Sequence, residues 1–434
     1  MEVQNMYKCN KEEKSWILYD CTISTYSMIL ITSIFPLYLR MVLKNNGVSE
    51  ASTTVYWGYL NSIGRFLIAI LAPILGTIAD YRGYKIKFFK IFCIIGIVAT
   101  GLLGIIPDSL YIVIAIIFTI STIGNSGSNV FYDAFLVDVT DKKNMDMISS
   151  IGFAAGYIGD IISLALCMVI VLLAQKNIIP IDVATACRIC FIITAIWCLL
   201  FSIPMIKNVK QVYGIDKENK VVTNSFKRLG KTLSNIRNHK NIFTFLLAYF
   251  FYIDGVNTII TMATSFGSDL GISSSSMLLV LLLIMFVAFP SSIIYGKLAE
   301  KHGAKIMLYA GIIIYSVICV YAYFIHNITG FMILAVLVGT SQGGVQAISR
   351  SYFGKLVPKE KNNEFFGFFN VFGRFAAILG PALVSLVTSL TGKTSNGVFS
   401  VLALFILGGL ILTKVEDVKI KDEIILKDEA IINN

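Results

Sequence analysis

Charged side chains are scarce in this sequence. Only 14% of its 434 residues are Asp, Glu, Lys or Arg, whereas about a quarter of a soluble domain is charged. There are only 8 prolines and no tract of low complexity, which excludes a proline-rich or otherwise biased disordered chain. The 8 cysteines are dispersed along the sequence, which excludes a disulfide-rich secreted scaffold.

Metal-binding and nucleophilic motifs are also sparse. Cys187 and Cys190 form a CxxC inside an apolar run, but no second pair or histidine lies nearby, which argues against a zinc site. The three histidines suggest no nucleophile–base pair. The stretch TGKTS at 391–395 resembles the end of a P-loop, but Val387 stands where its first glycine belongs. We therefore expect no enzyme, no ATP-driven pump, no metal and no cofactor.

Long apolar runs are what the chain has in abundance. Hydrophobic residues make up 56% of it, and a run of about 20 such residues can span a bilayer as a helix. The first fifteen residues are polar and lack the apolar core of a cleavable signal. The sequence predicts an all-α polytopic membrane protein with twelve transmembrane helices, at 16–40, 54–79, 88–106, 110–139, 147–174, 183–206, 242–266, 276–298, 305–326, 330–356, 364–391 and 396–414.

The positive charges are unevenly distributed between the two sides of these helices. About 28 of the 36 Lys and Arg residues fall on the side that carries both termini, so the positive-inside rule places both termini in the cytoplasm. The net charge of +10 is then an orientation signal and not evidence for nucleic-acid binding. The longest loop, 207–241, contains Phe226, Leu229, Leu233 and Ile236 at helical spacing among basic residues. It is either a basic amphipathic helix on the inner leaflet or a solvated linker.

The sequence repeats itself. The stretch GTIADYRGYK (Gly76–Lys85) follows the second predicted helix, and GKLAEKHGAK (Gly296–Lys305) follows the eighth. Gly152 and Gly159 are spaced like Gly373 and Gly380. Two six-helix bundles, 16–206 and 242–414, are therefore expected, flanked by cytoplasmic ends 1–15 and 415–434 and joined by the linker 207–241. Parallel repeats of this kind place a substrate site at their interface near mid-membrane.

The repeated loops predict a gate on the cytoplasmic side. Their glycines allow tight turns and close helix approach, and Asp80 can pair with a basic group or cap a neighbouring helix. We expect Arg82 to reach Asp138 at the end of the fourth helix. A charged turn that only fixes topology is the alternative. The gating residues predicted from both loops and the helices beside them are Gly76, Asp80, Arg82, Gly83, Lys85, Asp133, Asp138, Gly296, Glu300, Gly303 and Arg350.

The paired loops resemble the signature of the major facilitator superfamily. Further stretches resemble one branch of it, the autophagy-related vacuolar amino-acid effluxers and their bacterial relatives. These are WILYDCTISTYSMILITSIFPLY (16–38), VFYDAFLVD (130–138), FLLAYFFYIDGVNTII (245–260), VAFPSSIIYGKLAEKHGAK (287–305), SQGGVQAISRS (341–351) and EFFGFFNVFGRFAAILGP (364–381). The resemblance covers about 16–412 and implies a major facilitator fold and a secondary transporter, with neutral amino-acid efflux as the expected activity.

Polar residues inside the helices supply the candidate binding site. Asn125 and Asn129 form one stripe with Asp133, and Gln342 and Gln346 form another with Arg350, because residues four apart share a helix face. The resemblance implies that the first, fourth, seventh and tenth helices line the central cavity, so these stripes are expected to face each other. Interhelical hydrogen bonding is the alternative. Asp133 and Arg350 lie at equal depth and are predicted to bridge when the cytoplasmic side closes.

The remaining intramembrane charges need partners, because a buried charge in a membrane faces a cavity or pairs. Arg65 and Asp160 are both unusual for the resembled branch and are expected to form a structural pair. Asp254, with Asn257 one turn away, has three alternatives: a fixed bridge to Arg374, binding of a substrate ammonium, or a proton site. Asp20 lies about a turn inside the first helix. It either has an interfacial or capping role or contributes to substrate or proton binding.

Two classes of function remain open at this point. The first is a secondary transporter of small polar metabolites, most simply amino-acid efflux or exchange by alternating access, with protons as an optional coupling ion. The second is a lipid flippase or scramblase of facilitator fold; a peptide, sugar or osmolyte carrier is a further alternative. The expected partners are a small-molecule substrate, the lipid bilayer and protons, and the expected location is a bacterial cell membrane.

Overall fold

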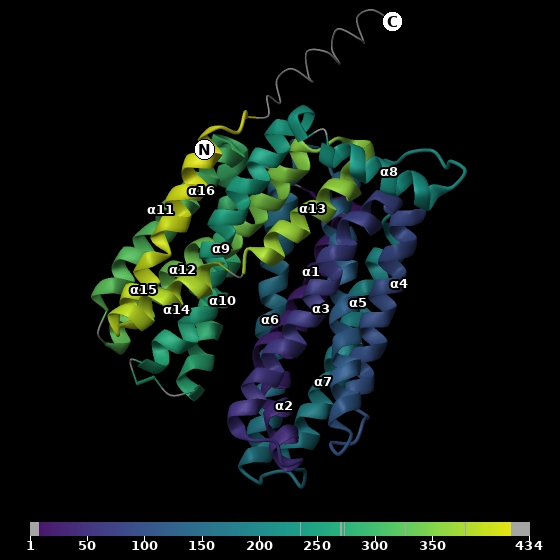
Figure 1. Cartoon of the computed structure of the whole chain (residues 1–434). Coiled ribbons are helices and arrows are strands. Elements are labelled where there is room, and N and C mark those ends of the chain that lie inside the picture. Colours follow the sequence, from purple (N-terminus) through teal and green to yellow (C-terminus); the bar gives the residue numbers. More distant parts are fainter. Residues whose placement is uncertain are drawn as a thin grey trace, which may run out of the picture. The chain divides into compact units, whose positions relative to one another are not determined.

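The computed structural model describes residues 8–417, apart from 235, 270, 273, 326 and 378. The predicted ends 1–15 and 415–434 thus lie partly outside the described residues. The described chain is almost wholly helical (Figure 1). Its elements are α1 Lys11–Tyr26, η1 Ser27–Ser33, α2 Ile34–Asn45, α3 Glu50–Ala79, α4 Tyr84–Leu103, α5 Tyr111–Val139, α6 Met145–Gln175, α7 Val183–Asn208, α8 Val221–Ser234, η2 Ile236–His239, α9 Lys240–Asp269, α10 Ser274–His302, α11 Ala304–Phe324, α12 Ile328–Leu356, η3 Lys359–Lys361, α13 Asn362–Phe375, α14 Leu379–Thr391, α15 Thr394–Ser400 and α16 Leu402–Thr413.

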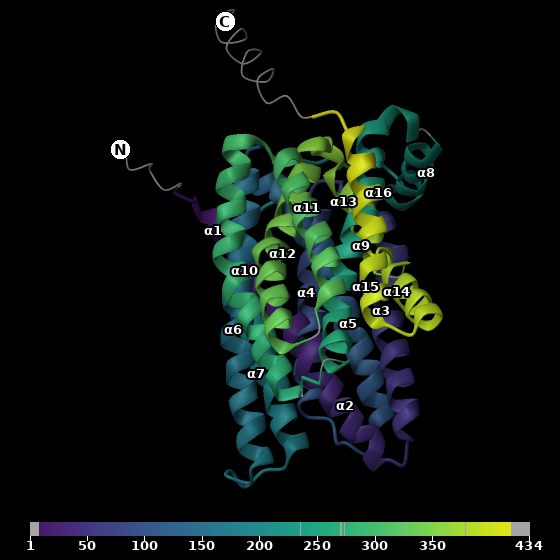
Figure 2. The same ribbon diagram turned by 90° about the vertical axis from the view of Figure 1, so that its left-hand side faces the viewer.

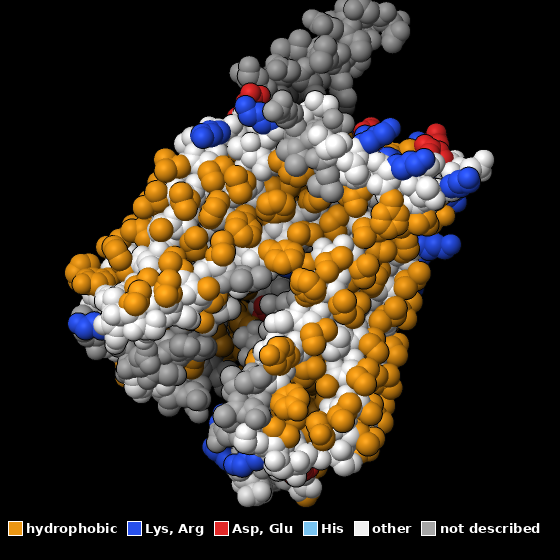
Figure 3. Space-filling view, viewed as in Figure 1, with side chains coloured by type: hydrophobic (Ala, Val, Ile, Leu, Met, Phe, Trp, Pro, Cys, Tyr) orange, Lys and Arg blue, Asp and Glu red, His pale blue; other side chains and the backbone are white. Residues whose placement is uncertain are grey.

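Twelve helical stretches among the described residues are long and apolar enough to cross a bilayer. This confirms the predicted fold class. The first stretch, Lys11–Asn45, joins α1 and α2 through the π-helical η1, and the eleventh, Lys359–Thr391, includes both α13 and α14. On the face shown in Figure 3, hydrophobic side chains cover the flanks of the helices, and Lys and Arg side chains gather near helix ends. This distribution is typical of lipid-facing helices.

Two compact units make up the structure, and each takes one segment from the opposite half of the sequence. Unit 1 comprises the described residues of Met1–Val139, Ile151–Leu229 and Asn363–Arg374. Unit 2 comprises those of Thr140–Ser150, Gly230–Asn362 and Phe375–Asn434. The first turns of α6 therefore belong with the later helices, and most of α13 belongs with the earlier ones.

Unit 1 is held together by aromatic stacking and by contacts between glycines. Phe35 of α2 stacks on Phe118 of α5 with ring centroids 4.0 Å apart. Helices α4 and α5 lie side by side (Figures 1 and 2), and a side chain at Gly124 would overlap the backbone of Gly96. Small residues at such crossings let helix backbones approach closely, which is how helices gain van der Waals contact in a membrane.

Unit 2 uses the same kind of packing. A side chain at Gly344 of α12 would overlap the ring of Tyr295 on α10. The hydroxyls of Tyr252 on α9 and Ser349 on α12 are 2.7 Å apart and form a buried hydrogen bond. Tyr315 of α11 stacks on Phe405 of α16 with centroids 5.4 Å apart. These contacts fix α9, α10 and α12, which carry the polar groups described below.

The eleventh transmembrane stretch is interrupted. The sequence predicts one helix over 364–391, but α13 ends at Phe375 and α14 begins at Leu379. Pro381 explains the interruption, because its ring would clash with the carbonyl four residues earlier in a continuous helix, whereas proline is tolerated in the first turn of a new one. The predicted span 364–391 is therefore confirmed, with an interruption that the sequence analysis did not predict.

The loop 207–241 contains the helix α8. Its residues Val222 and Phe226 are 56% and 51% exposed, and Lys227 and Lys231 are also exposed, as expected of a basic amphipathic helix. Arg228 instead points into unit 1, where its side chain is 19% exposed. The side chains of Leu233 and Ile236 lie outside the described part.

Candidate functional site

The end of α3 meets the start of α13 through Asp80. The Asp80 carboxylate is fully buried. Its Oδ1 accepts hydrogen bonds from the backbone N and the side-chain Nδ2 of Asn363, both at 3.0 Å. A carboxylate at the N-terminus of a helix satisfies otherwise unpaired N–H groups and is stabilised by the helix dipole. Asp80 therefore caps a neighbouring helix, one of the two roles that the sequence allowed.

Asp80 also has the other role, because it pairs with Arg228 of α8. The Arg228 Nη2 donates to Asp80 Oδ2 at 2.9 Å and to Glu364 Oε2 at 3.4 Å. The guanidinium lies over the Tyr81 ring, 5.4 Å from its centroid. Burial raises the pKa of Asp80 to about 7; Glu364 contributes to the rise, whereas Arg228 and Asn363 oppose it. We call Asp80, Arg228, Asn363 and Glu364 the Asp80 cluster.

Glycines make this approach possible. A side chain at Gly76 would overlap the carbonyl oxygen of Asn363, and one at Gly367 would lie 2.7 Å from the carbonyl oxygen of Ala72. Gly83 has φ +83° at the N-cap of α4, a conformation that glycine adopts without a steric penalty. The first repeated loop thus requires its glycines for two different reasons, close approach at Gly76 and backbone direction at Gly83.

Asp138, at the end of α5, is held by Lys85. The Lys85 Nζ donates to Asp138 Oδ2 within a fully buried ion pair and to the carbonyl of Ala134 at 3.2 Å. The backbone N–H groups of Val212 and Tyr213 donate to Asp138 Oδ1. The predicted contact between Arg82 and Asp138 is wrong.

Arg82 lies on the solvent side of the same turn. It pairs with Asp216 at 3.4 Å, and both side chains are well exposed. The left-handed turn at Gly83 separates the two basic residues. Lys85 enters the first turns of α4 beside α5, whereas Arg82 remains outside.

Unit 2 contains a second buried cluster at the start of α6. Asp146 accepts hydrogen bonds from Ser351 Oγ at 2.6 Å and from Lys355 Nζ, both on α12. The two charged side chains are 3% and 5% exposed. A side chain at Gly296 on α10 would lie 2.7 Å from Ser150 Cβ. We call Asp146, Ser351 and Lys355 the Asp146 cluster.

The second repeated loop shares with the first a glycine of positive φ at the N-cap of the next helix, but it differs in the ψ of that glycine (143° at Gly303, −6° at Gly83) and in its charges. Gly303 has φ +95° at the N-cap of α11, as Gly83 has at that of α4. Glu300, however, is exposed, whereas Asp80 is buried. In unit 2 the buried carboxylate comes instead from Asp146, on the segment that is exchanged between the sequence halves.

Asp133 and Arg350 lie in different units. Asp133 on α5 accepts a hydrogen bond from Asn370 Nδ2 of α13 at 3.3 Å. Arg350 on α12 donates to Ser149 Oγ and to its carbonyl oxygen at 3.0 and 3.1 Å. Each residue is therefore tied to the segment that its unit takes from the other sequence half. Their pairing with each other stays a prediction.

Asp254 lies in α9 and is fully buried. Its Oδ2 accepts a hydrogen bond from the backbone N of Gly380 at 2.9 Å, in the first turn of α14. Its Oδ1 has no hydrogen-bond partner among the described residues. A side chain at Gly380 would overlap the hydroxyl of Thr258, so α14 approaches α9 as closely as glycine permits. The helix interruption thus directs a helix N-terminus at a buried carboxylate with one unpaired oxygen.

The predicted binding amides are all half-buried. They are Asn125 and Asn129 on α5, Asn257 on α9, and Gln342 and Gln346 on α12. None of these side chains donates or accepts a hydrogen bond among the residues that the structure describes. A half-buried amide without a protein partner keeps its hydrogen-bonding capacity for water or a ligand. The arrangement of the α5 stripe opposite the α12 stripe joins different units and stays a prediction.

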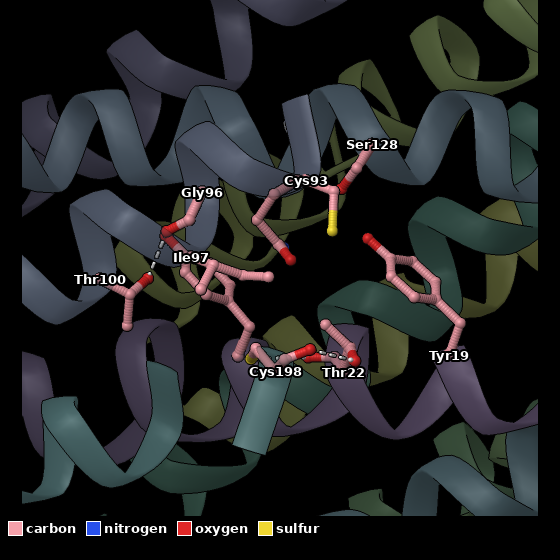
Figure 4. Close-up of a pocket in the computed structure, with 10 residues that line it drawn as sticks. Tyr19, Thr22, Cys93, Gly96, Ile97, Thr100, Ser128 and Cys198 are labelled. Carbon is pink, nitrogen blue, oxygen red and sulfur yellow. Dashed lines mark hydrogen bonds between the residues drawn. The ribbon is translucent and has the colours of Figure 1, made fainter. Parts of the chain in front are cut away.

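A small cavity lies inside unit 1 among α1, α4, α5 and α7 (Figure 4). It measures about 10 Å³ and is lined by groups that include Tyr19, Cys93, Thr100 and Ser128. The Tyr19 hydroxyl points into it, from the side opposite Thr100 (Figure 4). Since this volume is about the lower limit for one water molecule, the cavity is not a substrate site.

The remaining predicted charges are distributed within unit 1. Asp20 on α1 and Asp160 on α6 are 5% and 6% exposed. Arg374 at the end of α13 donates to the hydroxyl and carbonyl of Ser126 at 3.2 and 3.3 Å. The side chain of Arg65 lies outside the described residues, so its pairing with Asp160 stays a prediction. Asp254 and Arg374 lie in different units, so their pairing also stays a prediction.

Sequence reasoning missed the groups that complete both clusters. Asn363, Glu364 and Arg228 were not predicted as site residues, nor were Asp146 and Lys355. A signal existed for the first two, because the polar run Asn362–Glu364 directly precedes an apolar helix, a pattern typical of helix starts. The others contact residues more than a hundred positions away, and no local pattern identifies them.

Related proteins match almost the whole chain. The family described as vacuole effluxer Atg22 like matches residues 8–423. The uncharacterized MFS-type transporter YxiO of Bacillus subtilis is 54% identical over 412 residues, which cover 95% of this chain and 96% of that protein. Autophagy-related protein 22 of Vanderwaltozyma polyspora is 23% identical over 491 residues, covering 93% of this chain and 91% of that protein.

Solved structures show the same fold. The major facilitator superfamily proton:xylose symporter XylE aligns with a TM-score of 0.71 at 12% identity, covering 94% of this chain and 96% of that one. The human organic anion transporter MFSD10 aligns with a TM-score of 0.71 at 14% identity, covering 93% and 99%. The neighbours are transporters rather than enzymes, as the sequence predicted for this chain.

Proposed function

Because the chain belongs to the vacuole effluxer Atg22-like family and is a membrane transporter of the major facilitator kind, we propose that it moves neutral amino acids by alternating access. The resemblance in the sequence implies this substrate class. Asp254 is the observation that carries it: a fully buried carboxylate with an unpaired Oδ1 suits the ammonium group that all amino acids share.

The amides near Asp254 supply the rest of the proposed site. Asn257 lies one turn from it on α9, and Gln342 and Gln346 lie on α12, which packs against α9. Their N–H groups are suited to a substrate carboxylate and their carbonyl oxygens to its ammonium. Asn125 and Asn129 belong to unit 1, where Asn125 lines the small cavity among α1, α4, α5 and α7. A neutral side chain then needs only apolar surface, which the helices provide.

The two buried clusters are the proposed cytoplasmic gate. In each, a carboxylate binds the side chains or backbone of a segment from the other half of the sequence: Asp80 binds Asn363 and Asp146 binds Lys355. Alternating access requires such segments to separate once per cycle. The gate therefore includes Arg228, which brings the linker helix α8 into it, in addition to the glycines and charges of the repeated loops.

The positive-inside distribution supports the proposed orientation, with both termini in the cytoplasm of a bacterial cell. The basic face of α8 then meets the anionic inner leaflet. Efflux or exchange is the proposed direction, because the relatives include proteins of the vacuole effluxer family.

Proteoliposomes test this proposal. Purified protein should take up members of a labelled amino-acid mixture and should not accelerate the exchange of a fluorescent phospholipid between leaflets. Asp254→Asn preserves size and hydrogen bonding but removes the negative charge, so amino-acid uptake should fall at least tenfold. Asp216→Asn, at the exposed partner of Arg82, is the matched control and should transport normally.

Other results would redirect the proposal. Lipid exchange without amino-acid uptake would identify a lipid transporter instead. Uptake of peptides or sugars, without uptake of amino acids, would show that the protein carries one of those classes of substrate instead of amino acids. If Asp254→Asn retains substrate exchange but loses only accumulation driven by a pH gradient, Asp254 binds the coupling proton rather than the substrate ammonium.

A further inference from the structure

Polar side chains surround the small cavity of unit 1, although the helices that form it span the membrane. The cavity measures about 10 Å³ and lies among α1, α4, α5 and α7. Its lining residues with hydroxyl or amide groups include Tyr19, Thr22, Thr100, Ser128 and Asn125. Cavities that remain dry in proteins are apolar, whereas a polar cavity of this size can hold one ordered water molecule.

The Tyr19 hydroxyl is directed into this cavity. The tyrosine is only 1% exposed, and its hydroxyl points into the space shown in Figure 4. Its ring packs against the rings of Phe89 and Tyr132, with centroids 4.9 and 5.1 Å apart, so the side chain has little freedom to turn away. A buried tyrosine hydroxyl usually has a hydrogen-bond partner, because an unsatisfied one is destabilising. The cavity is the place where such a partner fits.

The other polar groups around the cavity have hydrogen-bonding capacity left. Ser128 Oγ donates its hydrogen to the carbonyl of Asn125 at 2.8 Å, and Thr22 Oγ1 donates to the carbonyl of Cys198 at 3.4 Å. Each hydroxyl oxygen can therefore still accept a hydrogen bond. The half-buried side-chain amide of Asn125 can donate or accept. A matching occupant thus donates to hydroxyl oxygens and accepts from the Tyr19 hydroxyl.

We propose that the cavity binds one water molecule, which accepts a hydrogen bond from Tyr19 and donates one to Ser128. Water both donates and accepts hydrogen bonds and is small enough for the volume. A metal cation or an ammonium ion does not fit, because none of the lining residues, all of which the structure describes, has a carboxylate to balance its charge within the membrane. The water joins α1 to α5 inside unit 1, whichever substrate the protein carries.

Radiolytic footprinting tests the site, because a short X-ray pulse converts bound water into hydroxyl radicals that oxidise the side chains beside it. In the intact transporter, peptide mass spectrometry should find Tyr19 oxidised about ten times as fast as Tyr252. Tyr252 is equally buried, but its hydroxyl is bonded to Ser349 and does not line the cavity. Ser128→Val fills the cavity and removes an acceptor, so it should slow the oxidation of Tyr19 several-fold. Equal rates for the two tyrosines, or an unchanged rate in Ser128→Val, would overturn the proposal.

Thermal stability provides a second test. Tyr19→Phe removes a hydroxyl that is bonded to water, so the melting temperature should fall by about 1–2 °C, as expected for one hydrogen bond in a chain of this length. Tyr81→Phe is the matched control: its hydroxyl is buried and has no partner among the described residues, so its removal should leave the melting temperature unchanged or raise it. If Tyr19→Phe also raises the melting temperature, the Tyr19 hydroxyl has no partner and the cavity is dry. If it lowers the melting temperature of a protein whose Tyr19 resists oxidation, the partner is a protein group, and the proposal is wrong.

Discussion

Asp80 accepts two hydrogen bonds from Asn363, a residue 283 positions later in the chain. The contact joins the first residue after α3 to the first turn of α13, and it places a carboxylate at a helix N-terminus. Such caps stabilise a helix by about 0.5–2 kcal/mol. A contact of this strength is weak enough to form and break within a transport cycle. It is also strong enough to shift the equilibrium between two conformations by about tenfold.

The first prediction concerns the glycine that permits this contact. Gly76→Ala introduces a methyl group where the Asn363 carbonyl oxygen lies, so the start of α13 must shift. Overpacking of this kind costs about 1–3 kcal/mol. We expect a lower melting temperature of the purified protein and a several-fold slower uptake in proteoliposomes.

A matched control exists on the same helix. A side chain at Gly58 of α3 meets no atom within 4 Å. Gly58→Ala should therefore leave uptake unchanged and keep the free energy of unfolding within about 0.5 kcal/mol of the wild-type value, or raise it slightly. Equal effects of the two substitutions would mean that the close approach at Gly76 is unimportant.

The second prediction is a pH dependence of stability that arises from Asp80. Its pKa is about 7 in the folded protein, above the ordinary value of about 3.9. The folded protein therefore holds this proton more tightly than the unfolded chain. The stabilisation is complete below about pH 4 and is lost as the pH rises through about 7. Acidification from about pH 8 to about pH 6 should raise the melting temperature of the wild type.

Asp80→Asn tests the assignment, because the amide cannot titrate but still accepts a hydrogen bond from Asn363. Between about pH 6 and 8, its melting temperature should therefore vary less with pH than that of the wild type. The loss of this one titrating group reduces the pH dependence of the unfolding free energy by up to about 1.4 kcal/mol per pH unit. Asp216→Asn should keep the wild-type profile. If Asp80→Asn keeps it too, another group is responsible.

The sequence was informative where the membrane determines the structure. Twelve long apolar runs could be recognised because each must span a hydrocarbon layer of fixed thickness, and they correspond to the twelve spans found in the described part of the chain. The interruption before Leu379 was missed, although Gly380 and Pro381 together are a local signal for it. An apolar run alone does not show whether its helix is continuous.

The partners of the buried charges could not be predicted in the same way. The stretch Asp80–Lys85 offers two basic residues on either side of Gly83, whose φ is positive, and the sequence alone does not tell that Lys85, rather than the exposed Arg82, reaches Asp138. The contact between Arg228 and Asp80 spans 148 residues. It depends on where the linker helix α8 docks, which no spacing rule specifies.

The third prediction concerns the Asp146 cluster. Asp146→Asn leaves the ammonium of Lys355 buried without its counter-charge, and the removal of one partner from a buried ion pair costs about 3–5 kcal/mol. We expect poor recovery of folded protein and a much lower melting temperature. The double variant Asp146→Asn with Lys355→Met removes both charges and should recover most of the loss.

The exposed pair of the other unit provides the comparison. Arg82→Gln breaks its ion pair with Asp216 in solvent, and such pairs contribute about 0–1 kcal/mol. Its melting temperature should therefore remain close to that of wild type. If Asp146→Asn were equally mild, the buried pair would not stabilise the segment of α6 that packs with α12.

The last prediction concerns Arg228, the residue of α8 that neutralises two buried carboxylates. Its Nη2 contacts both Asp80 and Glu364, so Arg228→Gln leaves two like charges close together and destabilises the contact between α3 and α13. If this contact closes the gate, the variant should have a lower melting temperature and an altered ratio of exchange to net uptake. Adding Glu364→Gln removes one of the unpaired charges and should restore part of both. Lys227→Gln removes an exposed charge from the same helix and should have neither effect. A failure of Glu364→Gln to rescue the variant would show that Arg228 acts through the docking of α8 as a whole and not through the two carboxylates.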